Sequence, residues 1–486
     1  MKGAVASGHP LTAKAAVEMF SLGGNAFDAA ISAGFVSIVT EPTLTSIGGG
    51  GFLLAHIEKQ NQDILFDFFV NTPGLNKQDN CKPVMDPVEI KFPQCAQVFH
   101  TGFASAAVPG MLKGLLHVHK RLCALPLKTV LSPALSYLKE GVEVSSLQEY
   151  MLSLLKPIFI STDYGRKIYT VNGRYLKQYD RLFNPLLKKF FHGIAAGGSD
   201  IYSGETARKL IEEMKAHHGM ITQDDLDAYE VVERKPLYIK YRDREIITNP
   251  HPSSGGTMLA FGLRLLEDVR LSALSHNSEK FLITLIELMK KTDSFKPMKN
   301  TSGKTFISTM GTTHISIIDE EGNAASITTS NGSGSGCFIP DTGIMLNNMM
   351  GEDDLHPDGF FSSSPNRRVS SMMIPVMVMK DGKVDFVLGS GGSKRIKTAI
   401  LQVLINAVDF HFPLREAVEK SRIHLEDSVV QAEPGIPRET IDSLRTHYPV
   451  NRWDQKNMYF GGVHCVDKKM DGWGDSRRGG SFLAVK

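Results

Sequence analysis

Near the start of the chain, apolar positions follow the spacing of two helices. We expect the first helix to be capped by Thr12 and to end before Gly23 and Gly24, because glycine favours helix termination. Asn25 is expected to cap the second, with Asp28 three residues later in the place of a capping box. The apolar face of the first helix comprises Ala13, Ala16, Val17 and Phe20.

Three later stretches alternate apolar and polar residues with the period of a β-strand. Each contains a polar turn, at 58–62, at 319–323 and at Asp381-Gly382. Such runs around a short polar turn predict antiparallel hairpins, and Asp-Gly is a strong hairpin signal.

A helix is expected at the end of "SKRIKTAILQVLINAVDF", where apolar residues occupy nearly all sides. An all-round apolar helix is typical of a buried element. Helices early, hairpins late and a helix covering a sheet indicate a layered α+β fold. The apolar residues are Ile400, Leu401, Val403, Leu404, Ile405, Ala407 and Val408.

Composition narrows the possible partners. The 486 residues are 42% hydrophobic and 22% charged, with 54 basic against 52 acidic residues and a net charge of +2. Such a balance creates no extended field for nucleic acid or an anionic membrane, so we expect a small-molecule partner. Neither a membrane-spanning run nor the apolar core of a leader is apparent, so we expect a cytoplasmic protein.

Cysteine and histidine spacing argues against a metal site. The five cysteines form no CxxC pair, so we interpret them as buried thiols and expect no metal ion. His117 and His119 are two residues apart and would point to different faces of a helix. The cysteines are Cys81, Cys95, Cys123, Cys337 and Cys465.

Several familiar motifs are absent or incomplete. Gly48–Gly51 precede no GK[ST], so tight backbone packing beside a site is favoured over a phosphate loop. The serines of "NGSGSGC" do not fit a G-x-S-x-G nucleophile elbow, and no H-E-x-x-H helix is present.

The Gly-Thr junction in "MGTTHISIID" has the residues that an N-terminal nucleophile requires. If the bond between Gly311 and Thr312 is cut, Thr312 acquires a free α-amine, whose pKa of about 7.7 to 8.0 suits a general base. One residue would then supply nucleophile and base. By itself, however, a Gly-Thr pair before a strand is usually only a loop end.

Motifs across the chain, taken together, resemble the gamma-glutamyltransferase family. They are "GAVASGHPLTAKAAVEMFSLGGNAFDAAIS", "IGGGGFLL", "PHPSSGGTMLA", "GTTHISIIDEEGNAASIT", "TGIMLNNMM", "RRVSSMMIPV", "LGSGGSKRI" and the closing "YFGGVHCVDKKMDGWGDSRRGG". The resemblance implies a four-layer αββα N-terminal nucleophile hydrolase that cuts itself between Gly311 and Thr312. Residues 1–311 would form a large subunit and 312–486 a small one, held as a heterodimer or a higher oligomer.

The resemblance also implies an activity without metal or cofactor. A γ-glutamyl amide such as glutathione would form an ester on Thr312 and pass the acyl group to water or an amino acid. Carried over by position, the other catalytic residues are Thr313 and Ser330, which support the nucleophile, and Gly391 and Gly392, whose N–H groups form the oxyanion hole. The substrate-binding residues are Asn331, Glu352, Ser370 and Ser371.

Departures from the family pattern put the usual substrate in question. Phe69 stands where the family has an arginine for the substrate's α-carboxylate, and Met349 stands where a glutamine is frequent. Glu352 replaces the aspartate that binds the α-amine. The segment 356–366 is also short, which predicts a more open site that favours hydrolysis. Substitute cations near the expected pocket are Arg367, Arg368, Lys394 and Arg395.

Three interpretations remain open at this point. The chain is a self-processed γ-glutamyl hydrolase or transferase, or an acylase with the same machinery and a different acyl group, or a non-catalytic member that stays in one piece. The intact Gly311-Thr312 junction favours the first, and Phe69 motivates the second.

Overall fold

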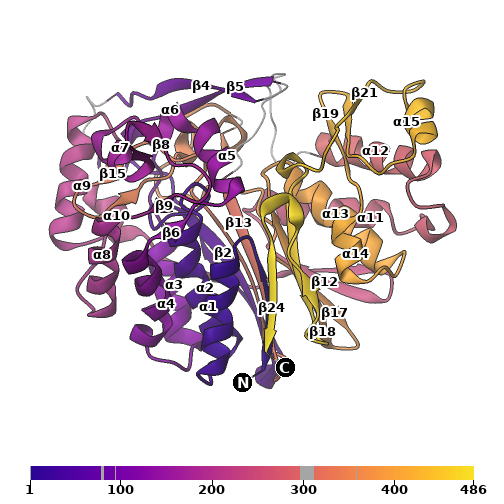
Figure 1. Ribbon diagram of the computed structural model, residues 1–486, viewed down its shortest axis with the longest axis horizontal. Coiled ribbons are helices and arrows are strands. Elements are labelled where there is room, and N and C mark those ends of the chain that lie inside the picture. Colours follow the sequence, from indigo (N-terminus) through magenta and orange to yellow (C-terminus); the bar gives the residue numbers. More distant parts are fainter. Residues whose placement is uncertain (1, 78–81, 93–94, 296–310, 357, 486) are drawn as a thin grey trace.

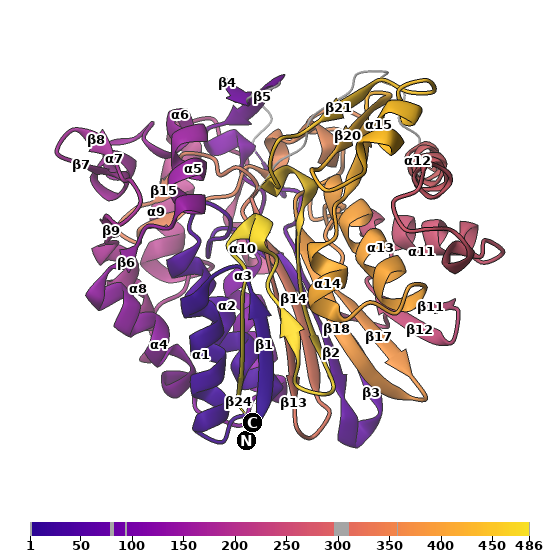
Figure 2. The same cartoon turned by 45° about the vertical axis from the view of Figure 1, so that its right-hand side comes forward.

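The protein is built of four layers, with helices outside two facing β-sheets (Figures 1 and 2). The computed structural model describes residues 2–77, 82–92, 95–295, 311–356 and 358–485. The α-β-β-α order agrees with the layered architecture expected from the sequence, and both chain ends lie side by side at one edge (Figure 1).

The first sheet has seven antiparallel strands in the order β10-β3-β2-β14-β13-β1-β24. The predicted hairpins around 58–62 and 319–323 supply its four consecutive strands β3, β2, β14 and β13. The N-terminal strand β1 lies between β13 and the C-terminal strand β24, so distant parts of the chain share one sheet. The strands are β1 (Gly3–Ser7), β2 (Gly50–Ile57), β3 (Gln62–Phe68), β10 (Val232–Arg234), β13 (Thr312–Asp319), β14 (Ala324–Ser330) and β24 (Ser481–Val485).

The second sheet has six strands in the order β11-β12-β17-β18-β22-β23. Its β17–β18 hairpin turns at Asp381 and Gly382, whose φ angles are 52° and 74°, and this confirms the hairpin predicted there. The strands are β11 (Leu237–Tyr241), β12 (Arg244–Thr248), β17 (Val376–Lys380), β18 (Lys383–Gly391), β22 (Gly462–Asp467) and β23 (Gly472–Trp473).

Helices cover the outer face of each sheet (Figures 1 and 2). Those on the first sheet's side are α1 (Pro10–Ser21), α2 (Ala26–Thr40), α3 (Met111–Leu122), α4 (Leu127–Glu140), α5 (Ser146–Leu154), α6 (Lys156–Phe159), α7 (Asp163–Tyr169), α8 (Pro185–Ala195), α9 (Gly204–Ala216) and α10 (Gln223–Ala228). Those on the other side are α11 (Ser254–Leu265), α12 (Glu279–Ser294), α13 (Arg395–Val408), α14 (Leu414–Glu419) and α15 (Arg438–Leu444).

Smaller strands form separate two- and three-stranded sheets. They are β4 (Asp86–Phe92), β5 (Cys95–Thr101), β6 (Val142–Glu143), β7 (Thr170–Val171), β8 (Arg174–Tyr175), β9 (Arg181–Leu182), β15 (Phe338–Ile339), β16 (Ile344–Met345), β19 (Ile423–Glu426), β20 (Val429–Ala432) and β21 (Val450–Arg452).

The caps of the first two helices test the N-terminal predictions. Asn25 and Asp28 form the expected reciprocal capping box at the start of α2. Thr12 is the wrong cap for α1, which begins at Pro10 after His9, whose Nδ1 accepts from the backbone N–H of Leu11 at 3.2 Å. Proline suits a first helical position because it has no N–H to leave unsatisfied.

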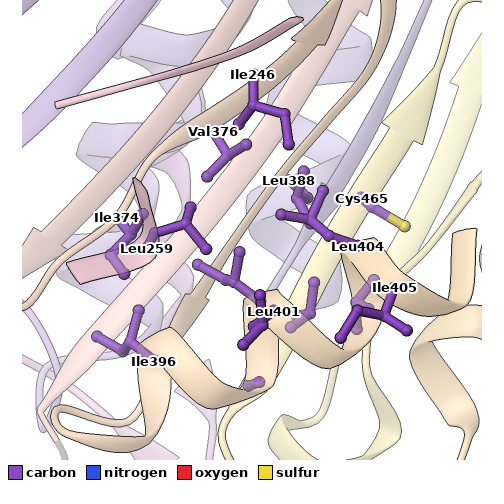
Figure 3. Close-up of a cluster of buried hydrophobic side chains, with 14 of the residues drawn as sticks. Ile246, Leu259, Ile374, Val376, Leu388, Ile396, Leu401, Leu404, Ile405 and Cys465 are labelled. Carbon is purple, nitrogen blue, oxygen red and sulfur yellow. The ribbon is translucent and has the colours of Figure 1, made fainter. Parts of the chain in front are cut away.

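The helix α13 packs its apolar side chains into the core between itself and the second sheet. Figure 3 shows Leu404 of α13 beside Leu388 of the sheet, and Leu401 and Val376 belong to the same cluster. Every residue of α13 except Ala407 is buried, which confirms the prediction of an interior helix. Each fully buried leucine side chain stabilises the fold by about 1.5–3 kcal/mol relative to an exposed one.

The cysteines and the paired histidines have structural surroundings. Cys337 and Cys465 are buried free thiols, and burial raises the pKa of Cys337 to about 12. Cys123 is half-buried, Cys81 lies outside the described residues, and the side chain of Cys95 is likewise not described. On α3, His117 contacts Glu233 and His119 contacts the carbonyl of Leu125, so the two rings have different partners.

In the described part of the chain, no helix combines the length and apolar character needed to cross a bilayer.

Candidate active site

Thr312 is the first residue of β13, a strand in the middle of the first sheet. It pairs with Ser330, the last residue of β14, and only 5% of Thr312 is exposed. The preceding residue has no room for a side chain, since a Cβ on Gly311 would lie 1.7 Å from the carbonyl oxygen of Gly332. Glycine is therefore required before Thr312 by close backbone packing.

The hydroxyl of Ser330 lies at the centre of the predicted cleavage junction. It accepts a hydrogen bond from the Thr312 hydroxyl at 3.4 Å and one from the Gly332 N–H at 3.1 Å. It donates to the carbonyl oxygen of Gly311. One side chain thus contacts both the attacking oxygen and the carbonyl that a self-cleaving reaction would attack.

Thr313 contacts a carboxylic acid that the sequence analysis did not single out. Its hydroxyl donates to Oε1 of Glu41 at 2.9 Å. Glu41 lies directly after the C-terminal end of α2. Burial raises the pKa of Glu41 to about 7, although the Thr313 hydrogen bond and the charge of Arg478 act in the opposite direction. The available signal was a carboxyl directly after a mostly apolar helix and before the glycine run.

Arg478 is a second residue that sequence reasoning missed. Its Nη1 donates to the carbonyl oxygen of Thr312 at 3.0 Å, from the short helix η7 (Ser476–Arg478), and its side chain is buried. Burial, together with the charge of Arg395, lowers the pKa of this guanidinium to about 10. Asp475 and Glu41 act to raise it. It therefore remains a buried cation at neutral pH.

The two glycines expected in the oxyanion hole lie beside the nucleophile. Gly391 ends β18, and a Cβ there would be 2.3 Å from the carbonyl oxygen of Thr312 and 2.7 Å from Nη1 of Arg478. Gly392 has a φ of 128°, a conformation that favours glycine. The structure thus brings the end of the second sheet against the start of β13.

The loop after Ser330 brings Asn331 and Glu352 to the same region. Gly332 has a φ of 61°, and a Cβ there would lie 2.2 Å from both Oδ1 of Asn348 and Oε1 of Glu352. Asn331 is held by its N–H, which donates to the carbonyl of Leu44 at 3.1 Å. Asn331 and Glu352 are both buried.

Ser370 and Ser371 belong to a neighbouring cluster at the start of α11. The hydroxyls of Ser370 and Ser254 are 2.7 Å apart, and the N–H groups of Ser254 and Gly255 both donate to the Ser371 carbonyl at 3.0 Å. These contacts join "RRVSSMMIPV" to "PHPSSGGTMLA". Within the described residues, neither serine of the pair hydrogen-bonds to Thr312.

The aromatic residue that replaces the family's arginine is part of the core. Phe69 is 1% exposed and stacks on Phe52, with ring centroids 5.6 Å apart. Met349 is buried in the same apolar cluster. The two departures from the family pattern are therefore compatible with each other, because both residues contribute apolar volume.

Arg368, one of the candidate substitutes for the missing arginine, contacts other residues of the protein. Its Nε pairs with Oδ1 of Asp67 at 3.1 Å, and its Nη1 donates to the carbonyl of Phe69 and to the hydroxyl of Tyr229. Arg395 is also engaged, with its Nε 3.2 Å from the carbonyl of Tyr459 and its guanidinium over that ring. Both guanidinium groups therefore have partners within the protein, and their role as substitutes stays a prediction.

The other candidate cations have different surroundings. Arg367 is exposed, and its backbone N–H donates to the hydroxyl of Thr72. Lys394 is half-buried, directly before α13.

The glycine run confirms the prediction of tight packing. A Cβ on Gly49 would lie 2.2 Å from the carbonyl oxygen of Ser330, and one on Gly48 would lie 2.3 Å from that of Met345. Thr312, Thr313 and Ser330 are each at most 5% exposed, and the more open site expected from the short 356–366 segment stays a prediction. Pro357 of that segment lies outside the described residues.

Among the residues that the structure describes, no group of three or more His, Cys, Asp or Glu side chains is placed to hold a metal ion.

Known proteins resemble this chain over most of its length. The profile of the family described as gamma-glutamyltranspeptidase matches residues 12–294 and 291–485. An acylase ACY 1 proenzyme of Pseudomonas sp. (strain V22) is 30% identical, over 97% of this chain and 90% of the relative. A glutathione hydrolase proenzyme of Pseudomonas aeruginosa is 30% identical, over 87% of this chain and 82% of the relative.

Solved structures show the same fold. A cephalosporin acylase from Bacillus halodurans superimposes with a TM-score of 0.84 at 22% identity, covering 100% of this chain and 96% of the other. A Helicobacter pylori gamma-glutamyltranspeptidase has a TM-score of 0.52 at 29% identity, over 59% of this chain and 80% of that one. The N-terminal nucleophile hydrolase fold and the resemblance drawn from the motifs are confirmed, and the chain belongs to the gamma-glutamyltranspeptidase family.

Proposed function

We propose that the protein is a self-processing amidohydrolase that cuts its own chain before Thr312 and then uses Thr312 to carry an acyl group. The observation that supports this proposal most directly is the position of the Ser330 hydroxyl, which contacts both the Thr312 hydroxyl and the Gly311 carbonyl. Membership of a family whose relatives are named glutathione hydrolase and acylase proenzymes supports an enzymatic role.

The proposed cut proceeds by transfer of an acyl group within the chain. The Thr312 oxygen attacks the Gly311 carbonyl carbon, while the Ser330 O–H stabilises the negative charge on the carbonyl oxygen. The C–N bond breaks, the proton lost by the Thr312 hydroxyl passes to the nitrogen to give the amine of Thr312, and Gly311 is left as an ester on the threonine. Water then hydrolyses the ester to give a Gly311 carboxylate and a free Thr312 hydroxyl.

In the proposed turnover, the α-amine of Thr312 removes the proton from its own hydroxyl. The oxygen attacks the substrate amide, the backbone N–H groups of Gly391 and Gly392 bind the oxyanion, and the amine product leaves. Water or an amino acid then takes the acyl group. Residues 1–311 and 312–486 would remain together because β1 and β2 of one piece pair with β13 and β14 of the other.

For the acyl group, we propose one whose far end carries no carboxylate. Support comes from Phe69 and Met349, which are buried in one apolar cluster at family positions for an arginine and a glutamine. A carboxylate placed there would lose water without gaining a charged partner, which is costly. Arg368 cannot pair with it while it pairs with Asp67.

A γ-glutamyl group is the second candidate. The buried carboxyl of Glu352 beside Gly332 supports it, because a carboxylate there suits the α-amine of such a substrate.

The first test of the proposed function is processing. Purified wild-type protein should convert from one 53.5 kDa chain to two fragments on a denaturing gel, with N-terminal sequencing of the smaller fragment beginning at Thr312. The Thr312→Ala variant should stay whole. A wild-type chain that remains a single band after incubation would support the non-catalytic interpretation.

The second test is the acyl group. Matched anilides of butyric, glutaric and γ-glutamic acid differ at the far end of the acyl chain, so their kcat/KM values report which end the site accepts. We expect the butyryl compound to be hydrolysed fastest. Preference for the γ-glutamyl compound would instead support the Glu352 interpretation.

A further inference from the structure

Two buried groups of opposite charge approach the predicted nucleophile from different elements. Glu41 reaches Thr313 from the end of α2, and Arg478 reaches the carbonyl of Thr312 from η7. The two contacts involve adjacent residues of β13. The second carboxyl oxygen of Glu41, Oε2, is buried and has no hydrogen-bond partner among the described residues.

Glycines allow both charged groups to come this close. A Cβ on Gly8 would lie 2.5 Å from Oε1 of Glu41 and 3.0 Å from the hydroxyl oxygen of Thr313. On the other side, a Cβ on Gly391 would lie 2.7 Å from Nη1 of Arg478. Backbone packing of this kind keeps water away, and charge interactions are stronger where water is excluded.

We propose that Glu41 and Arg478 act in opposite directions on the α-amine that cleavage creates at Thr312, with Arg478 favouring the neutral amine and Glu41 favouring the ammonium. The inference rests on the proposed function, since it concerns the enzyme after cleavage. Both are positioning residues, because they act on the protonation of Thr312 and are not assigned contact with substrate.

The sign of each effect follows from charge. A neighbouring cation disfavours the protonated amine and lowers its pKa, whereas a neighbouring anion raises it. Burial raises the pKa of Glu41 to about 7, so this carboxyl gains its charge only as the solution approaches neutrality. Arg478, whose pKa is lowered to about 10, is charged throughout that range. An α-amine ordinarily titrates at about 7.7 to 8.0, where Glu41 and Arg478 are both charged, so both act on the Thr312 amine in that range.

Other charged or titratable groups surround this pair. Arg395 adds positive charge near Arg478, and Glu352 and Asp475 add negative charge, that of Asp475 being paired with two buried arginines. His314 and His464 are buried, and burial lowers the pKa of each imidazole, so both are neutral. All of these stay in place when only Glu41 or Arg478 is replaced, so the variants isolate the pair.

The test measures the acid limb of kcat/KM against pH in cleaved enzyme, with an anilide whose own groups do not titrate in that range. Glu41→Gln keeps the shape and the hydrogen-bond acceptor but removes the negative charge, so the acid limb should move down by about one pH unit. Arg478→Gln removes the positive charge, so it should move up by about one pH unit. Arg478→Lys keeps the charge and should restore the wild-type limb.

Opposite shifts for the two charge-removing variants are the expected result, and a merely structural role would not produce them. An unchanged limb, or an upward shift in Glu41→Gln, would overturn the inference. If Arg478→Gln does not fold or is not cut, Glu41→Gln and Arg478→Lys still decide. Failure of the wild-type chain to be cut would defeat the proposed function itself, so the two failures are distinguishable on the gel.

Discussion

The nucleophile end and the acyl end of the candidate site are built in different ways. Around Thr312, positions are held by backbone contacts at Gly311 and Gly391, where an added Cβ would collide with the carbonyl oxygens of Gly332 and Thr312. Around Phe69, positions are held by side-chain packing, with its ring stacked on Phe52. Backbone contacts of this closeness tolerate no side chain, whereas an apolar cluster accepts residues of similar volume.

This difference suits the proposed function, in which the chemistry at Thr312 is retained and the acyl group differs. Under the proposed function, phenylalanine in place of a charged recognition residue changes what the acyl end accepts, and Phe69 and Met349 are both buried there. The hydroxyls of Thr312 and Ser330 are unaffected, because their positions depend on the ends of β13 and β14.

The largest effect is expected at Gly311. In Gly311→Ala the new methyl would lie 1.7 Å from the Gly332 carbonyl oxygen, so the scissile carbonyl must move away from Ser330 and self-cleavage should be lost. The fraction of cut chain on a denaturing gel over time measures this. Gly198→Ala is the control, since the nearest atom to its Cβ is 4.0 Å away. Normal cutting of Gly311→Ala would contradict the close-packing argument.

Removing the Ser330 hydroxyl should have the next largest effect. Ser330→Ala takes away the donor to the Gly311 carbonyl, and loss of one such donor slows a reaction by about 100- to 1,000-fold. Ser330→Thr keeps a hydroxyl and should retain most of the rate. The measurement is the rate constant of self-cleavage, and a wild-type rate in Ser330→Ala would show that the hydroxyl is dispensable.

At the acyl end, Phe69→Ala should reduce stability while leaving self-cleavage in place. Loss of a buried phenylalanine side chain costs about 3–5 kcal/mol of unfolding free energy, while Phe69→Leu should cost less because it keeps more volume. Each Phe69 substitution is combined with Thr312→Ala, which is expected to keep the chain whole. Urea unfolding then measures the difference in unfolding free energy between Phe69→Ala and Phe69→Leu. Loss of cutting in folded Phe69→Ala would show that the two ends are not separable.

The smallest effect on substrate choice is expected at Arg368. Arg368→Met removes one partner of buried Asp67 and should cost about 3 kcal/mol of stability, although Arg234 still pairs with that carboxylate. The ratio of kcat/KM for the butyryl compound to that for the γ-glutamyl compound should stay within about twofold of the wild-type ratio. A tenfold change would correspond to about 1.4 kcal/mol. A large fall in γ-glutamyl hydrolysis alone would mean that Arg368 does recognise the substrate. Exposed Arg367→Met is the matched control.

Local signals in the sequence predicted the elements that local physics specifies. The Asn25–Asp28 capping box and the Asp381-Gly382 turn depend on residues a few positions apart, and both are present. The first cap failed for a local reason as well, because His9 followed by Pro10 outcompetes Thr12, whose hydroxyl instead contacts Thr40.

The two site residues that the sequence did not predict, Glu41 and Arg478, reach the site through contacts between residues far apart in the chain. Glu41 and Thr313 are 272 positions apart, and Thr312 and Arg478 are 166 apart. No periodicity or spacing rule connects such pairs. Arg368 is the opposite case. Its motif predicted a position near the expected pocket, but in the structure its guanidinium pairs with Asp67, which lies in a distant segment of the chain.

The sequence by itself determined the hairpins, the interior helix α13 and the family, while cleavage at the Gly311-Thr312 junction stays a prediction. Alternation along β13 and β14 distinguished two faces but not what covers them. Only the tertiary structure decided that the face carrying Ser316 and Ser326 lies against the second sheet, where their hydroxyls donate to the carbonyls of His464 and Leu388. The physical reason is that a strand's period of two specifies which side chains share a face, while the partner of that face depends on how distant elements pack.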